Sequence, residues 1–179
     1  MNPTAPLAFQ LDVSSMLLDY HLAGLSAEDL TWAPAPTHWT MHQGESGTWE
    51  PDWADVEPDP VPVPNVAWVS WHLIWWWSCT LADVRGQSAP GRTELGWQPD
   101  PDWIRSKLAE LRTAWSAVLT DLTEADLAEP SAFPWPADAG RTRLDQLAWV
   151  TVEHTKNVAE LGQLMMLRRA GGDVRAGIR

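Results

Sequence analysis

Cysteine is almost absent from this chain, and lysine and arginine are absent from residues 1–84. Cys79 is the single cysteine among 179 residues, so an intramolecular disulfide and a cysteine-rich zinc site are excluded. This usage suits a reducing compartment, and no basic segment followed by a long apolar run is found near Met1. We therefore expect a cytoplasmic protein without a signal peptide.

Lysine and arginine are missing from residues 1–84, which carry 11 acidic residues. Residues 85–179 have 12 basic and 13 acidic residues, and the whole chain has a formal net charge of −12. Such a charge repels phosphate groups, so nucleic acid and an anionic membrane are poor partners. Phosphate loops, dinucleotide fingerprints and the common zinc-protease and serine-hydrolase motifs are also missing.

Long apolar runs are scarce as well. Residues 66–82 lack charges, but this run is shorter than the roughly 20 residues that a membrane span needs, and it contains His72 and five tryptophans. Apolar residues instead recur at helical spacing in four long segments, and no strand alternation is found. These patterns predict an all-α four-helix bundle, one domain over residues 1–170, with long helices at about 7–22, 66–84, 101–122 and 143–169.

Proline and tryptophan dominate the segment between the first two long helices. Residues 33–64 contain seven prolines, which exclude a helix, together with Trp39, Trp49 and Trp53. A loop of this length is either an ordered flap or a mobile lid. Because exposed tryptophan is unfavourable, we expect a flap that its tryptophans hold in place. At the other end of the chain, residues 171–179 are expected to form a flexible tail.

His72 lies on the most aromatic helical pattern, on the same face as Trp68, Trp71, Trp75 and Cys79. A histidine buried among tryptophans requires a partner, which is either a hydrogen-bonding side chain or a divalent metal ion. On chemical grounds alone the hydrogen bond is favoured.

The last long helix offers two faces to such a histidine. His154 belongs to its apolar stripe, whereas Lys156 and Glu160 are four residues apart on another face, at ion-pair spacing. His154 and Glu160 are separated by about 120° around the helix, so both cannot easily serve one compact site.

Three segments carry a resemblance to a known family: LAGLSAEDLTWAPAP, VAWVSWHLIWWWSCTLADV and TRLDQLAWVTVEHTKNVAELGQLMMLRR. Together they resemble the DinB-like superfamily, the damage-inducible and YfiT-type four-helix bundles. The resemblance implies an up-down-down-up bundle, frequent homodimers and, in many members, a divalent metal held by three histidines. Members with intact sites include thiol-cofactor-dependent transferases and isomerases.

Compared residue by residue, His72 matches the metal ligand of the second long helix, and Gly162 and Gln163 match the pair that follows the last-helix ligands. The two ligand positions themselves are Lys156 and Glu160. Lysine is a poor ligand because its ammonium must first lose a proton. The resemblance therefore implies a broken metal triad, and we expect either no cofactor or a weakly held Zn, Ni or Mn ion on His72 and Glu160, with His154 as an alternative ligand.

Three functions follow as hypotheses. The first is a homodimeric protein that binds a small molecule in a metal-free or weakly metal-binding pocket, formed by His72, Trp68, Trp75, Lys156, Asn157 and Glu160, with a hydrogen bond between His72 and Glu160. The second is a divalent-metal-dependent transferase or hydrolase that uses His72 and Glu160 beneath a closing flap. The third is a protein-interaction module that uses the acidic, tryptophan-rich flap.

Overall fold

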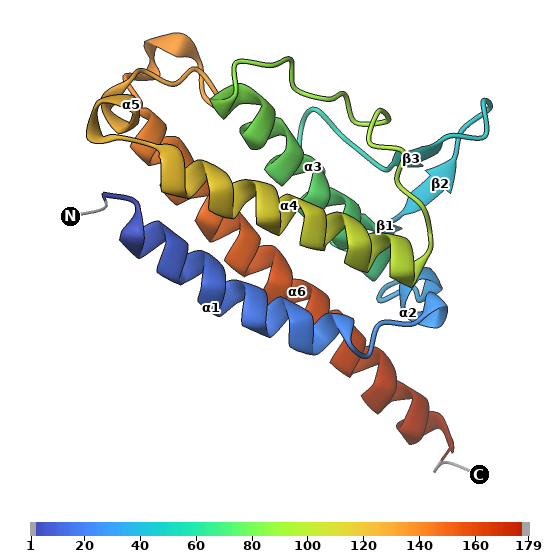
Figure 1. The fold of residues 1–179 in the computed structure, drawn as a ribbon. Coiled ribbons are helices and arrows are strands. Elements are labelled where there is room, and N and C mark those ends of the chain that lie inside the picture. Colours follow the sequence, from blue (N-terminus) through green and yellow to red (C-terminus); the bar gives the residue numbers. More distant parts are fainter. Residues whose placement is uncertain (1–2, 177–179) are drawn as a thin grey trace.

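Four long helices form the body of the molecule: α1 (Ala5–Leu22), α3 (Val66–Val84), α4 (Pro101–Asp121) and α6 (Arg143–Ala176). The structure, a computed structural model, describes residues 3–176 and the side chains of residues 3–171. Figure 1 shows α1 and α6 running in one direction and α3 and α4 in the other. Both α4 and α6 pack against α1 and α3. The predicted all-α bundle is confirmed.

The helices begin where the sequence supplies capping groups. The Asn65 side chain accepts a hydrogen bond from the backbone N–H of Trp68, and Asp100 caps α4 directly before Pro101. Thr142 and Asp145 exchange hydrogen bonds at the start of α6. That helix continues to Ala176 rather than ending near residue 169 as predicted. Residues 177–179 of the expected tail lie outside the described residues.

The core is filled from apolar stripes at helical spacing. One stripe runs along α4 through Ile104, Leu108, Leu111 and Trp115, all of which are buried. On α6 the sequence provides Gly162, and a β-carbon placed there would collide with the His21 ring of α1. The His21 ring therefore fills the space between α1 and α6 that a side chain at position 162 would occupy.

The flap contains four short strands that the sequence pattern did not predict. Strand β1 (His38–Trp39) pairs in parallel with β4 (Val63–Pro64), and β2 (Met41–Gln43) pairs antiparallel with β3 (Trp49–Pro51). Strands of two or three residues are too short to show alternation, and proline stands in β3 and β4. The expectation that no strand would form was wrong for this reason.

Tryptophan rings attach the flap to the bundle. The Trp39 ring stacks on Trp68 of α3 with 5.2 Å between ring centroids, and Trp53 meets Trp75 edge-on at 5.6 Å. The Trp68 indole N–H also donates a hydrogen bond of 2.8 Å to the Asp52 carbonyl oxygen. Asn65 then ties the end of the flap to Thr40 by a 2.7 Å hydrogen bond. The flap is an ordered wall over one side of α3.

Three short helices complete the described part of the chain: α2 (Ala27–Thr31), α5 (Glu124–Ala128) and the 3-10 turn η1 (Ala137–Ala139). Helix α2 precedes the flap and is held by Asp29, which is fully buried and forms a 2.6 Å ion pair with Arg168 of α6. Burial opposes ionisation of Asp29, but hydrogen bonds from Ser26 and Arg168 and the positive charge of Arg168 outweigh it and lower its pKa. The start of the flap is therefore fixed to the bundle.

Among the described residues, no helix has the length and apolarity needed to cross a membrane. Large apolar side chains are nevertheless exposed along the outer side of α1, namely Phe9, Val13, Met16 and Tyr20. The homodimer implied by the family resemblance stays a prediction.

Candidate functional site

His72 lies in the middle of α3, beneath the flap. Its ring is stacked on Trp68, with 4.5 Å between the ring centroids and an interplanar angle of 18°. Trp76, one helical turn further along α3, meets the same imidazole edge-on. Because only 8% of His72 is exposed, both of its ring nitrogens require partners within the protein.

Both ring nitrogens of His72 have such partners. The Trp76 indole N–H donates to His72 Nε2 across 2.7 Å, which requires an unprotonated Nε2. The remaining ring proton is then on Nδ1, which lies 3.3 Å from the Asn157 Oδ1 of α6 and donates to it. The imidazole is therefore held as one neutral tautomer.

Electrostatics favour the same neutral form. Burial, together with the nearby positive charge of Lys156, lowers the pKa of His72 to about 3, and the hydrogen bond with Asn157 opposes this shift. At neutral pH the ring carries no charge. It can accept and donate hydrogen bonds, but it is a weak base and has no dissociable proton near neutrality for general acid catalysis.

Asn157 is the residue of α6 that faces His72. Lys156 lies beside it, with Nζ 3.4 Å from Asn157 Oδ1 and 3.6 Å from Glu160 Oε2. The predicted hydrogen bond between His72 and Glu160 is not formed, since Glu160 pairs with Lys156 instead. The amide nitrogen of Asn157 is buried and has no hydrogen-bond partner among the described residues.

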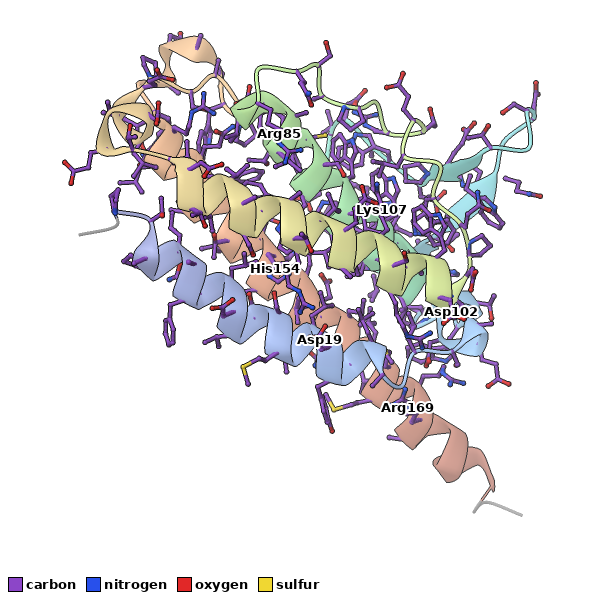
Figure 2. All side chains as sticks on the ribbon, viewed as in Figure 1. Asp19, Arg85, Asp102, Lys107, His154 and Arg169 are labelled. Carbon is purple, nitrogen blue, oxygen red and sulfur yellow. The ribbon has the colours of Figure 1, made fainter. Side chains whose placement is uncertain are left out.

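His154 belongs to a different part of the bundle. Its ring stacks on Trp77 at 4.1 Å between centroids, and its Nδ1 is 2.9 Å from Ser14 Oγ of α1. Figure 2 places His154 within the bundle, between α6 and the neighbouring helices. Burial alone lowers its pKa to about 3. His154 and His72 therefore do not share a site.

A cavity of about 440 Å³ is lined by residues of the flap, α3 and α6. Four of the predicted pocket residues line it: Trp68, His72, Lys156 and Glu160. Asn157 is not among the lining residues and holds the His72 ring in place. Trp75 does not line the cavity either, because its indole N–H donates to the Pro90 carbonyl oxygen on the side of the following loop.

Sequence reasoning missed four tryptophans of this cavity, namely Trp39 and Trp53 of the flap and Trp76 and Trp149 of the helices. Trp76 follows His72 by four residues, and Trp149 precedes Lys156 by seven, so each repeats the face of a residue that was already a candidate. The indoles of Trp76 and Trp149 meet edge-on with 5.0 Å between ring centroids. The signal for Trp76 was present as helical spacing, because at about 100° per residue Trp76 lies roughly 40° from His72 around the helix and Trp75 roughly 60°.

The metal that the family resemblance implies does not fit these residues. The Nε2 lone pair of His72 already accepts the Trp76 proton, and its other neighbours on α6 are an amide and an ammonium. Among the described side chains, no three from histidine, cysteine, aspartate and glutamate are placed to hold a metal ion together. The ammonium of Lys156 would also repel a cation at Glu160.

Cys79 is the other residue of α3 that could carry chemistry. Burial raises the pKa of its thiol to about 12, and Sγ lies 3.5 Å from the Pro90 carbonyl oxygen. The thiolate is the reactive form of cysteine, so this thiol is inert at neutral pH.

Comparison with known proteins bears on the whole bundle. Residues 10–161 match the family model described as the DinB superfamily. The matched range begins in α1, contains α3 with His72 and ends at Leu161 of α6. No curated protein and no solved structure gave a match. The chain belongs to the DinB superfamily.

Proposed function

We propose that this protein binds a small molecule in the cavity between the flap and α3, without a metal ion. The observation that carries the proposal is the cavity itself, whose volume of about 440 Å³ lies within the usual range of roughly 300–1,000 Å³ for ligand sites. Its walls come from the flap and from two helices far apart in the sequence.

The surroundings of His72 support a binding role over catalysis. The imidazole stays neutral, its tautomer is fixed by Trp76 and Asn157, and its lone pair is already engaged. A ring held in this way is a fixed part of the cavity wall, and it offers neither a free base nor a nucleophile. The cavity also contains no cysteine, and Cys79 is buried in the unreactive thiol form.

The metal-dependent transferase or hydrolase is not supported by the same residues. Its chemistry needs a cation at His72 and Glu160, but Glu160 is paired with Lys156 and His72 Nε2 with Trp76. Elemental analysis of protein purified without a histidine tag tests this point. We expect substoichiometric Zn, Ni and Mn, and stoichiometric metal that disappears in His72→Ala would overturn the proposal.

Small-molecule binding is tested by filling the cavity. A fragment library is screened by nuclear magnetic resonance, with the indole N–H signals of Trp68 and Trp76 as reporters. Ala54 lines the cavity from the flap, so Ala54→Phe occupies part of the space. We expect fragments to shift these two signals in the unaltered protein and to lose at least ten-fold in affinity in Ala54→Phe.

The matched control is Ala117→Phe, an equal enlargement at an exposed position of α4 away from the cavity. Fragment binding should be unchanged in this variant. Thermal unfolding of both variants shows whether the flap remains folded. A library in which no fragment perturbs Trp68 or Trp76, or one whose hits bind equally to Ala54→Phe, would refute the proposed function.

A further inference from the structure

The chemistry of the cavity walls indicates what kind of small molecule fits. Five tryptophans line the cavity: Trp39 and Trp53 of the flap, Trp68 and Trp76 of α3, and Trp149 of α6. Indole rings are large apolar surfaces whose faces also attract positive charge. Aromatic side chains therefore enclose the space from three separate elements of the fold.

Acidic groups stand among these rings. Asp55 and Glu57 line the cavity from the flap, and Glu153 and Glu160 line it from α6, while Lys156 is the only basic residue in the lining. His72 adds no positive charge at neutral pH, since burial keeps it neutral. The lining thus carries four carboxylates and one ammonium.

Ion pairs compensate only part of this negative charge. Lys156 is paired with Glu160 at 3.6 Å, and Arg92, which lies outside the lining, is paired with Asp55 at 3.3 Å. Among the described side chains, Glu57 and Glu153 have no ion-pair partner. One of them lies on the flap and the other on α6, so uncompensated negative charge borders the cavity on both sides.

The protein already places one cation on this aromatic wall. The Arg92 guanidinium carbon lies 4.2 Å from the ring centroid of Trp53, within the distance at which a cation and an aromatic face attract each other. Arg92 itself is an exposed residue of the loop that follows α3. A tryptophan face and a carboxylate thus bind a positive group beside the cavity, and the cavity lining contains the same combination of groups.

We propose that the cavity binds a small organic cation, namely an alkylated ammonium whose apolar substituents contact the tryptophans while Glu57 and Glu153 balance its charge. This inference rests on the proposed function, and it adds the charge and chemical class of the ligand. Anionic ligands are disfavoured by the same carboxylates, and a hydrated metal ion has no apolar substituents that could pack against the indoles.

The test compares three molecules of nearly equal shape that differ in charge: choline, its neutral analogue 3,3-dimethylbutan-1-ol, and the anion 3,3-dimethylbutanoate. Dissociation constants are measured from the indole N–H signals at low ionic strength. We expect choline to bind at least ten-fold more tightly than the neutral alcohol and the anion to bind most weakly. Added salt should weaken choline binding and leave the alcohol unaffected.

The variant Glu153→Gln removes one uncompensated charge while conserving shape. It should weaken choline binding about five-fold and leave alcohol binding unchanged, because a charge at the cavity edge interacts with the ligand through partly screened solvent. Glu57→Gln provides the same test from the flap. The control is Glu124→Gln, on the exposed surface of α5 and outside the cavity lining, which should change neither affinity.

The outcomes separate this inference from the proposed function. Equal affinity for choline and the alcohol, or an unchanged choline affinity in both Glu153→Gln and Glu57→Gln, would overturn the cation inference while the cavity remained a binding site. Failure of all three molecules would overturn the cation inference too. The fragment screen decides independently whether the cavity binds anything.

Discussion

Two buried histidines in this protein look alike by almost every local measure. His72 and His154 each stack on a tryptophan, each place Nδ1 against a polar side chain of another helix, and burial is the largest cause that lowers the pKa of each to about 3. Ser14 Oγ lies 2.8 Å from the Gln10 carbonyl oxygen and donates to it, so it accepts the His154 Nδ1 proton. Both rings are then the same neutral tautomer.

The two sites differ at the other ring nitrogen and in the space beside it. His72 Nε2 accepts from Trp76 next to a cavity of about 440 Å³, whereas His154 Nε2 has no partner among the described residues and borders a cavity of about 10 Å³. Burial, stacking and a lowered pKa therefore do not distinguish a residue of the proposed binding site from a residue of the core. The open, charged surroundings of His72 make that distinction.

The largest expected effect is a loss of stability at mildly acidic pH that both histidines share. Each has a folded pKa of about 3, below the unfolded value of 6.5, so between these values the unfolded chain binds protons that the folded chain excludes. The two neutral rings make their full contribution to the free energy of unfolding above pH 6.5, and this contribution is lost as the pH falls below 6.5. The slope should approach about 1.4 kcal/mol per pH unit for each ring.

Chemical denaturation between pH 7 and pH 5 measures this slope, in a range where most carboxylates remain ionised. His72→Gln and His154→Gln should each remove the contribution of one ring, even if they also change the stability at pH 7. Part of the slope should remain in both variants, because burial and the charge of Arg169 also lower the pKa of His21. If either variant kept the full slope, the corresponding ring would be exposed or already charged. The two histidines would then not be alike as buried, neutral rings.

The second largest expected effect is a difference in stability between the alanine variants of His154 and His72. His154 is 1% exposed and is packed between Trp77 and Ser14 inside the bundle, so His154→Ala should lower the free energy of unfolding by about 3 kcal/mol. His72 borders a cavity that solvent enters, and His72→Ala should lower it by about 1–2 kcal/mol. Ligand affinity should instead fall more in His72→Ala than in His154→Ala.

Urea denaturation and the fragment assay, applied to both variants, test this reversal. The fragment affinity should fall in His72→Ala and stay constant in a folded His154→Ala protein. A His154→Ala variant that lost fragment binding while its melting remained cooperative would show that the two histidines act together.

Features of the fold that depend on neighbouring residues in the chain could be predicted from the sequence, whereas contacts between helices could not. Caps such as Asn65 and Asp100, and stripes such as that through Ile104, are set within a few residues, and the predicted helices were correct there. The burial of His72 was also predictable because Trp68 and Trp71 lie on its own helix.

The partner of His72 depended on information that no single helix contains. Asn157 lies between His154 and Glu160 in the sequence, and the rotation of α6 about its axis decides which of the three faces the His72 ring. Helix α6 packs against both α1 and α3, and on the α1 side the His21 ring occupies the space beside Gly162. The sequence therefore indicated which residues of α6 were candidate partners of His72. The packing between helices determines that Asn157 is the partner.

The smallest expected effect comes from removing the hydrogen bond between Trp76 and His72 Nε2, which has no counterpart at His154. Trp76→Phe keeps an aromatic ring at this position and removes the N–H that donates to His72 Nε2. The loss of this bond should cost about 1 kcal/mol and make His72 Nε2 an unpartnered acceptor, like that of His154. Because the bond requires the unprotonated ring, its removal should also raise the pKa of His72 while burial keeps it below 6.5.

Nitrogen chemical shifts of the two imidazoles at neutral pH report this change directly. In Trp76→Phe the Nε2 signal of His72 should move toward that of His154, and the His154 signals should stay in place. Trp75→Phe is the matched control, because the Trp75 indole donates to the Pro90 carbonyl oxygen and leaves His72 untouched. An unmoved Nε2 signal in Trp76→Phe would mean that the tautomer of His72 is set from α6 alone, through Asn157.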